Sequence, residues 1–153
     1  MQRNVDSKLS SQSELWLKDF IDVYQTLSTK NLGLLETIYH KEVTFIDPIH
    51  QIEGLDNLHR YFQHLYENLS SCDFVIEHVI SQEKEAAIYW QMSYQHPKLN
   101  KGKIVEVQGS SHIKSQEDKI IYHRDYLDLG AMLYEQLPVF GQLTKWIKTR
   151  AAN

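Results

Sequence analysis

The chain has 153 residues, which suits one globular domain, because chains divide into several domains only near roughly 250 to 300 residues. Hydrophobic residues make up 42% of the sequence and charged residues 24%, which excludes a largely disordered or collagen-like chain. The net charge of −4, without a long basic run, argues against a nucleic-acid-binding surface. No apolar run approaches the roughly 20 residues of a membrane-spanning helix, so we expect no membrane insertion.

The features that bear on cellular location point to the cytoplasm. Residues 1–12 are polar and lack the apolar stretch of a secretory signal, so a flexible tail is expected there. Cys72 is the only cysteine and therefore cannot form a disulfide within the chain. We therefore predict a cytoplasmic protein.

The first half of the chain is predicted to be mainly helical. Near the N-terminus, apolar residues recur at steps of three and four, which is the spacing of one helical face. The residues of this face are Trp16, Phe20, Val23, Tyr24 and Leu27. A shorter helix is expected over 34–38, followed by a strand over 43–46 that stops at the turn Asp47-Pro48. A third amphipathic helix is predicted over 55–69.

The second half of the chain is predicted to be a β-meander. Beyond Cys72 the spacing of apolar residues changes from about 3.6 to 2, the period of a strand. The predicted strands begin at Phe74 and then extend over 86–95, 103–114 and 119–128. Three helices followed by an antiparallel meander predict an α+β domain over 13–130. Residues 131–153 are predicted to be a C-terminal helical extension of that domain.

The order of these elements resembles the nuclear transport factor 2-like superfamily, and its SnoaL-like and ketosteroid-isomerase-like bacterial members in particular. The resemblance includes the Asp47-Pro48 turn after the first strand and the stretch His-Arg-Asp-Tyr-Leu-Asp at 123–128, and it covers about residues 13–130. It implies a cone-shaped, curved antiparallel sheet with three N-terminal helices packed on its concave face. It also implies a small-molecule pocket inside the cone and homodimers joined through sheet faces.

Two candidate catalytic residues follow from the resemblance to the steroid isomerases. Tyr24 matches the position of their oxyanion-donating tyrosine, and Asp47 matches their general-base aspartate. A tyrosine O–H can stabilise charge on a carbonyl oxygen, and a carboxylate in an apolar pocket can carry a proton. Ser110 stands where that family has a protonated aspartate as its second donor, and a serine is a weaker donor there. Steroid isomerisation itself is therefore less well supported than proton transfer in general.

The last predicted strand supplies a second candidate carboxylate. Its sequence over 124–128 resembles a motif of SnoaL-like and limonene-epoxide-hydrolase-like proteins whose first Asp, here Asp125, faces the pocket. A period of 2 places His123, Asp125 and Leu127 on one face, so His123 and Asp125 are expected to act as a pair. The Arg-x-Asp that the epoxide hydrolases use on an earlier strand is absent from 90–94, and epoxide hydrolysis by their mechanism is therefore less well supported.

Each candidate also has a structural alternative. Asp47 before Pro48 is a common turn pair, and Tyr24 lies on an apolar helical stripe where core tyrosines are common. Asp125 has apolar neighbours on its strand face, where an unpaired carboxylate would be costly, so a pocket role is expected for it. In a cone, the core face and the ligand wall are partly the same surface. The predicted pocket lining is Trp90, Met92, Tyr94, Ser110, His112 and Leu127.

The motifs of metal, nucleotide and nucleophilic chemistry are missing from the sequence. The eight histidines show no compact metal-ligand spacing, and there is no glycine-rich phosphate loop or nucleophile elbow. We therefore predict no metal and no cofactor. The leading hypothesis is a cofactor-independent isomerase, lyase, cyclase or hydrolase that uses Asp, His and Tyr for proton transfer on a small apolar or polycyclic ligand. The alternative is a non-catalytic ligand-binding or dimerisation module of the same fold.

Two expectations concern assembly. A homodimer is predicted because Tyr89 and the pair Val105 and Val107 give both faces of the meander apolar character. The C-terminal extension has basic residues beside Trp146 and Ile147, a composition also found in helices on membrane surfaces. Packing against the domain or a second subunit is the favoured interpretation of that extension.

Overall fold

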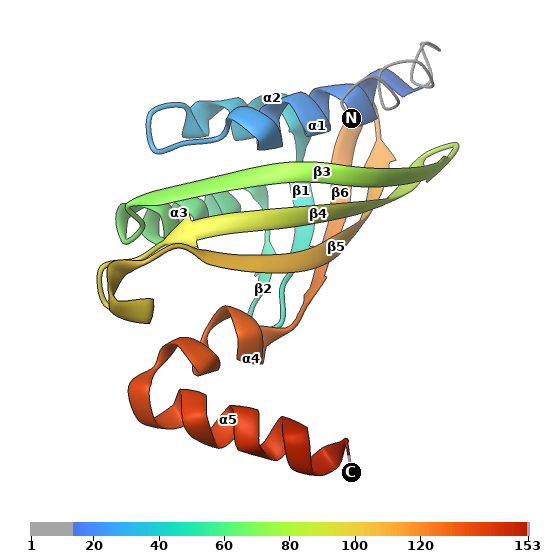
Figure 1. Cartoon of the computed structure of the whole chain (residues 1–153). Coiled ribbons are helices and arrows are strands. Elements are labelled where there is room, and N and C mark those ends of the chain that lie inside the picture. Colours follow the sequence, from blue (N-terminus) through green and yellow to red (C-terminus); the bar gives the residue numbers. More distant parts are fainter. Residues whose placement is uncertain (1–13, 153) are drawn as a thin grey trace.

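The computed structural model describes residues 14–152, so the tail predicted at 1–12 lies outside the described residues (Figure 1). The N-terminal helical elements of this part of the chain are α1 (Leu15–Thr26), η3 (Leu32–Leu34), α2 (Leu35–Ile38) and α3 (Leu55–Glu67). The strands are β1 (Tyr39–Ile46), β2 (Gln51–Glu53), β3 (Ser71–Gln82), β4 (Glu85–Gln95), β5 (Val105–Gln116) and β6 (Lys119–Leu127). The remaining elements are η4 (Asn100–Gly102), α4 (Leu129–Met132), η5 (Tyr134–Gln136) and α5 (Pro138–Ala151).

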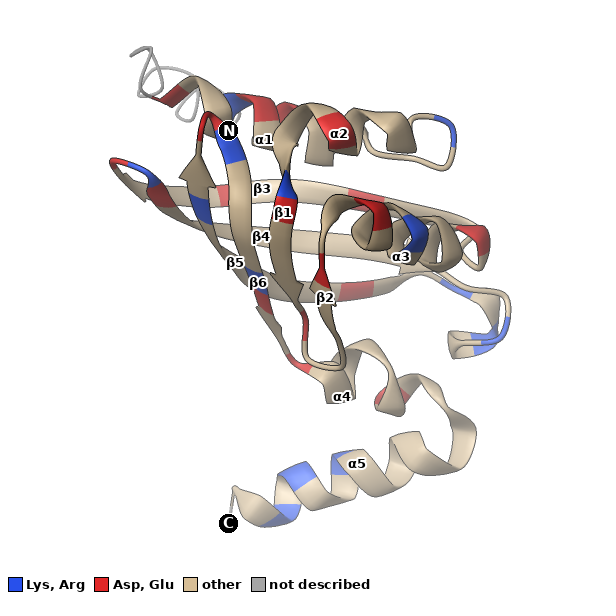
Figure 2. Ribbon diagram, turned by 180° about the vertical axis from the view of Figure 1, so that it is seen from behind, with Lys and Arg blue, Asp and Glu red and all other residues tan. Residues whose placement is uncertain are grey.

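The strands form one curved sheet in the order β2-β1-β6-β5-β4-β3. Strands β3 to β6 are the predicted antiparallel meander. Strand β1 pairs antiparallel with β2 and parallel with β6, as the view from behind shows (Figure 2). The predicted α+β fold with a curved sheet is confirmed, and the parallel pair β1 and β6 is its one departure from a fully antiparallel arrangement among the described strands.

The first two strands differ from the sequence-based prediction. Strand β1 begins at Tyr39, whereas the apolar pattern predicts a strand only over 43–46. The pairing of β1 with β6 shifts in register between Tyr39 and Thr44, and this irregularity interrupts the alternation that a period-based prediction needs. Strand β2 has three residues, which are too few to show a period.

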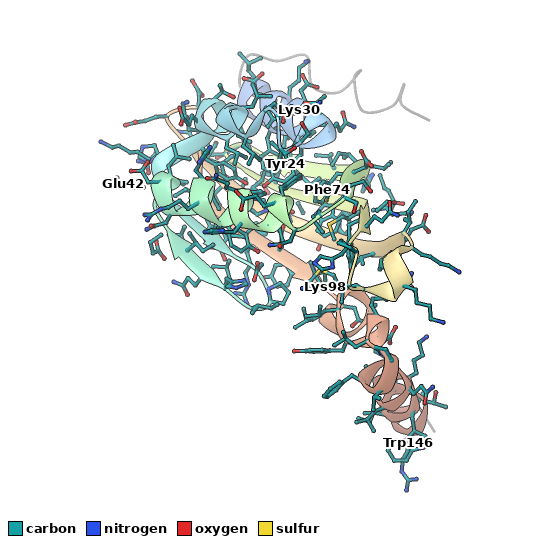
Figure 3. All side chains as sticks on the ribbon, turned by 90° about the vertical axis from the view of Figure 1, so that its left-hand side faces the viewer. Tyr24, Lys30, Glu42, Phe74, Lys98 and Trp146 are labelled. Atoms are coloured by element: carbon teal, nitrogen blue, oxygen red, sulfur yellow. The ribbon has the colours of Figure 1, made fainter. Side chains whose placement is uncertain are left out.

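The core lies between the N-terminal helices and the concave face of the sheet. Helix α1 buries one side, formed by Trp16, Leu17, Phe20, Ile21, Val23 and Tyr24. Phe20 and Tyr24 stack with ring centroids 4.4 Å apart, and Phe74 of β3 meets Tyr24 edge-on at 5.7 Å (Figure 3). Such aromatic pairs each contribute about 0.5–1.5 kcal/mol beyond the burial of area. The deep part of the cone is therefore a packed aromatic core.

The C-terminal segment packs against the end of the sheet and then leaves it. Asp128 caps α4, where its Oδ1 accepts a hydrogen bond from the Ala131 N–H at 3.1 Å. The Tyr94 hydroxyl donates to the carbonyl of Met132, which ties α4 to β4. Helix α5 stands apart from the sheet, and its Trp146 points away from the body of the molecule (Figures 1 and 3). Within residues 14–152, no helix combines the length and apolar composition that crossing a bilayer requires.

A glycine on β5 makes room for the indole of Trp90. The register places Gly109 directly opposite Trp90 on β4. A Cβ added to Gly109 would lie 2.3 Å from Cη2 of the indole, closer than real Cβ contacts come. Any larger residue at this position therefore forces the indole or the backbone to shift.

We predict that Gly109→Ala lowers the free energy of unfolding by about 1–3 kcal/mol, because overpacking forces the indole or the backbone to shift. Gly33→Ala is the matched control, because a Cβ on Gly33 meets no atom within 4 Å. The control should remain within about 1 kcal/mol of the wild type. Urea unfolding followed by tryptophan fluorescence measures both variants, and equal losses would contradict the steric explanation.

Candidate functional site

A series of hydrogen-bonded side chains crosses the interior from α1 to β6. The hydroxyl oxygens of Tyr24 and Tyr39 lie 2.5 Å apart, and the Tyr39 hydroxyl lies 2.6 Å from His123 Nδ1. His123 Nε2 lies 2.7 Å from Asp125 Oδ1. The His123 side chain is 0% exposed, whereas that of Asp125 is 19% exposed. The series therefore connects a dry aromatic interior to a carboxylate at its solvent-facing end.

The direction of these hydrogen bonds follows from the chemistry of the imidazole ring. A neutral imidazole donates from one nitrogen and accepts at the other, and an ionised carboxylate only accepts. In the neutral form of His123, Nε2 therefore donates to Asp125 and Nδ1 accepts from the Tyr39 hydroxyl. Tyr39 must then accept from the Tyr24 hydroxyl. All donors in this arrangement point toward the Asp125 carboxylate.

A second set of donors ends on the same carboxylate oxygen. Trp90 Nε1 donates to Ser111 Oγ at 2.9 Å, and Ser111 Oγ donates to Asp125 Oδ1 at 2.5 Å. Ser111 and Asp125 are direct partners in the pairing of β5 with β6. Within the described residues, His123 and Ser111 both bond to Oδ1, and no bond reaches Oδ2. Oδ2 is therefore the carboxylate atom that can meet a ligand.

The two buried tyrosines of this network are held in their neutral form. Burial, helped by the nearby Tyr39 and the charge of Asp125, raises the pKa of Tyr24 well above its ordinary value. Burial also raises the pKa of Tyr39, although its hydrogen bond with Tyr24 acts in the opposite direction. Both hydroxyls therefore keep their protons as donors over the physiological pH range.

These raised pKa values predict a loss of stability at alkaline pH. An unfolded tyrosine ionises near pH 10, whereas Tyr24 and Tyr39 in the folded protein retain their protons at that pH. The folded state then binds more protons than the unfolded state. The contribution of the two tyrosines to the free energy of unfolding is therefore fully present below about pH 10 and decreases as the pH rises above it. Urea unfolding between pH 8 and 11 measures this slope. Tyr24→Phe should make the slope shallower, and an unchanged slope would contradict the assignment.

Asp47 belongs to a separate cluster at the end of β1. Its Oδ1 accepts from the backbone N–H groups of Ile49 at 2.7 Å and His50 at 2.6 Å, and its Oδ2 accepts from the Tyr61 hydroxyl. Burial acts to raise the pKa of Asp47, but the hydrogen bonds it accepts outweigh burial and lower the pKa. This is the behaviour of an Asp that shapes its own turn. Among the described residues, Tyr24 is not a hydrogen-bond partner of Asp47.

Tyr61 of α3 connects the surroundings of the two carboxylates. Burial raises the pKa of Tyr61, and the hydrogen bond to Asp47 and the charges of Asp47 and Asp125 raise it further. Strands β1 and β6 run parallel with Phe45 opposite His123, so both strands deliver their aspartates to the same end of the sheet. Asp47 and Asp125 thus share one neighbourhood while each keeps its own donors.

Two residues predicted to line the pocket face the other side of the sheet. Buried Val107, Ser111 and Ile113 alternate along β5 with more exposed residues, which places Ser110 and His112 on the convex face. His112 bonds there to Glu85 and packs edge-on against Tyr122. The β5–β6 register shifts between Lys114 and Ser115, and a gapless count back from the last strand misses this irregularity. Ser111 is therefore the serine of the site.

The other predicted lining residues lie on the concave face. Trp90 and Tyr94 are buried, and Met92 and Leu127 are half-buried between the two apolar clusters of the interior. Two hollows of about 410 and 420 Å³ lie elsewhere, the first against Gln91, Glu106 and Asp128 and the second beside the β3–β4 turn. Neither hollow is lined by Asp125, whose side chain is 19% exposed.

Two observations bear on other chemistries. Within residues 14–152, no group of three or more His, Cys, Asp or Glu side chains is placed to hold a metal ion. Burial raises the pKa of the Cys72 thiol to about 11, so this thiol is protonated near neutral pH and is a poor nucleophile.

Three side chains of the site, Tyr39, Ser111 and Tyr61, are not among the residues predicted from sequence. Strict alternation along β5 from Val107 through Gly109 would have identified Ser111, because all three share one face. Tyr39 precedes the regular part of β1, and the sequence carries no signal for its contact with His123, 84 positions away.

The helices on the concave side of the curved sheet define a nuclear transport factor 2-like cone. A family model described as SnoaL-like domain matches residues 20–123, well over half of the chain. The chain therefore belongs to the SnoaL-like domain family, as the sequence resemblance predicts. A comparison of the sequence with curated proteins gives no match.

Solved structures share the same fold at low sequence identity. A protein of Jannaschia sp. CCS1 named as a SnoaL-like polyketide cyclase has a TM-score of 0.70 and 13% identity, over 80% of this chain and 92% of its own. A Catenulispora acidiphila protein with a ketosteroid isomerase-like fold, in complex with trimethylamine, has a TM-score of 0.69 and 13% identity, over 80% and 93%. TerC, co-crystallised with polyporic acid, has a TM-score of 0.67 and 11% identity, over 76% and 94%.

We predict that Tyr39→Phe costs about 1–3 kcal/mol of unfolding free energy, because it leaves both His123 Nδ1 and the Tyr24 hydroxyl buried without their partner. Tyr24→Phe should cost less, since it removes only the terminal donor of the series. Tyr126→Phe, on the exposed convex face, should stay within about 0.5 kcal/mol of the wild type. Chemical unfolding of the three variants measures the order, and a cost for Tyr24→Phe above that for Tyr39→Phe would contradict it.

Proposed function

We propose that this SnoaL-like protein is a cofactor-independent acid–base enzyme in which Asp125 transfers the proton. The observation that supports the proposal is the convergence of His123 and Ser111 on one oxygen of the Asp125 carboxylate while the other oxygen stays open. A turn role needs no such arrangement. A partly exposed carboxylate held in one orientation is suited to proton transfer.

The remaining residues of the network would position Asp125. His123 and Ser111 hold Oδ1, so Oδ2 takes a proton from the substrate or returns one to it. Tyr39 fixes the tautomer and the ring orientation of His123 by donating to Nδ1. Tyr24 orients the Tyr39 hydroxyl, and it can serve as an oxyanion donor only after that hydrogen bond is exchanged.

The proposed substrate class rests on half-buried apolar residues of the concave face that also carries Asp125. Met92 and Leu127 are apolar, adaptable side chains at the border between the two clusters of the interior. We propose a small, largely apolar or polycyclic substrate that carries an acidic C–H or a carbonyl group. The name polyketide cyclase and the polyporic acid complex among similar structures are consistent with such a compound. Isomerisation, dehydration, cyclisation and hydrolysis remain within this proposal.

The second candidate function is a non-catalytic ligand-binding module. The observation that favours it is the dense packing of the aromatic interior, which gives His123 and its partners a structural role as a satisfied polar core. A ligand would then bind near Asp125 without being converted. The two candidates differ in what the purified protein does to a bound compound.

The proposal also includes a cytoplasmic homodimer. Val75, Tyr89 and Tyr126 expose large side chains on the convex face, and this face would carry the contact between subunits. Contrary to the prediction from sequence, Val105 and Val107 are buried in the smaller interior cluster and therefore take no part in this contact.

Mass spectrometry of small molecules that co-purify with the chain identifies the compound to be assayed. We predict that Asp125→Asn lowers turnover of that compound by at least about 100-fold, because the amide cannot accept the proton. The fold should persist, since the amide oxygen can still accept from His123 and Ser111. Asp47→Asn is the matched control and should retain turnover within about 10-fold.

Full turnover by Asp125→Asn would overturn the catalytic assignment. Binding of the compound by the wild type and by Asp125→Asn without conversion by either would favour the ligand-binding module.

A further inference from the structure

Helix α5 is amphipathic, but its polar side faces its own domain and its apolar side faces away from it. Its inner side contacts the body through small and polar residues at helical spacing, Gly141, Thr144 and Lys148. A Cβ on Gly141 would lie 2.5 Å from the Glu135 carbonyl oxygen, so the helix backbone approaches η5 closely. Lys148 pairs with Asp128 at 2.5 Å and with Glu135 at 2.8 Å.

The apolar side of α5 faces outward. The large exposed side chains of this outer stripe are Val139, Phe140, Leu143, Trp146 and Ile147, with exposed fractions of 49–77%. Figure 3 shows Trp146 at the far end of the helix, directed away from the sheet. Five large apolar residues on one side of a single helix form a contiguous surface of the kind that marks a binding interface.

The charge of α5 indicates what covers the outer stripe. Residues 138–151 contain Lys145, Lys148 and Arg150 and no acidic residue, so the net charge of −4 leaves −7 on the rest of the chain. An anionic membrane would attract the helix but repel that strongly acidic body. Lys148 is already paired with Asp128 and Glu135, whereas Arg150 lies on the same side of the helix as Leu143, and a second copy of the same chain presents an acidic surface that complements this cation.

On the convex face of the sheet, the distance between an apolar row and an acidic row is similar to the distance between Leu143 and Arg150 on α5. Tyr89, Ser110 and Tyr126 are neighbours in one cross-strand row, and Asp73, Ser93 and Glu106 form another. Tyr89 and Ser93 are four residues apart on β4, which separates the two rows by about 13 Å. On α5, Leu143 and Arg150 lie two turns apart on the same side, about 10 Å along the helix. An α5 laid along the strands thus puts Leu143 on the tyrosine row and Arg150 beside the acidic row.

We infer that α5 is an exchanged arm, which packs its outer stripe on the convex face of a second copy of this chain while the partner's α5 does the same in return. The contact is isologous and closes as a two-fold dimer. The inference builds on the proposed homodimer and is independent of the proposed catalysis at Asp125. It assigns to α5 a contact that the sheet faces alone would not require.

Light scattering of the full chain at 5–100 μM tests the inference and should give about 36 kDa, twice the 18.0 kDa of one chain. Leu143→Asp, which puts a charge in the outer stripe, should weaken association by at least about 10-fold and give monomers. Gln142→Asp, on the polar side of the same helix, is the matched control and should remain dimeric. Tyr89→Asp, in the receiving surface, should dissociate the dimer as Leu143→Asp does. Circular dichroism and urea unfolding establish that each variant is folded.

The other outcomes overturn the inference in distinguishable ways. A wild type of about 18 kDa at 100 μM rejects both the arm and the proposed homodimer. Dissociation by Tyr89→Asp but not by Leu143→Asp leaves a homodimer joined by sheets alone and rejects the arm. Dissociation by Leu143→Asp but not by Tyr89→Asp indicates pairing of α5 with α5. Co-sedimentation of the wild type, but not of Leu143→Asp, with vesicles of phosphatidylcholine and phosphatidylserine indicates a membrane surface instead.

Discussion

A completely buried imidazole is the constraint around which the interior is arranged. Without partners, the two ring nitrogens of His123 would each cost about 1–3 kcal/mol in an apolar core. Tyr39 and Asp125 satisfy them, and the rings of Phe20, Phe45 and Tyr39 enclose the imidazole at centroid distances of 4.8–5.9 Å. The position of each partner is therefore fixed by a requirement of stability as well as by any chemistry.

The same arrangement explains how a carboxylate can lie beside a packed aromatic core. Asp125 receives donors from both neighbouring directions, through His123 on its own strand and Ser111 on β5. Its side chain is 19% exposed, and Leu127, two residues further along β6, packs with Met92 and Met132 against the smaller apolar cluster. The rings around His123 are held by stacking and hydrogen bonds, whereas Met92 and Leu127 are flexible side chains between the two apolar clusters. The side chains at the border of the two apolar clusters can thus move, whereas the aromatic rings around His123 are held in place.

The fold could be predicted from the sequence because periodicity is a local property. The change of period after Cys72 predicts the meander, and period 2 within one strand places His123 and Asp125 side by side. What the sequence could not provide is contact between elements that are distant along the chain, such as Tyr39 with His123. Irregular registers were the second obstacle, since the shift after Lys114 moved the expected serine by one residue and hence to the opposite face. Resemblance to the steroid isomerases paired Tyr24 with Asp47, whereas the hydrogen bonds pair Tyr24 with Tyr39 and leave Asp47 to its turn.

The parallel pairing of β1 with β6 has a consequence for how the protein folds. It joins residues near position 40 to residues near position 122, so this pairing closes a loop that contains α3 and strands β2 to β5. Closing so long a loop costs chain entropy before its contacts can stabilise the structure. Topologies rich in such pairings therefore fold slowly. The hydrogen bond from Tyr39 to His123 spans the same two strands. Recovery of the site after dilution from denaturant should therefore follow the slowest structural phase, after the helices and the β3–β4 hairpin have formed.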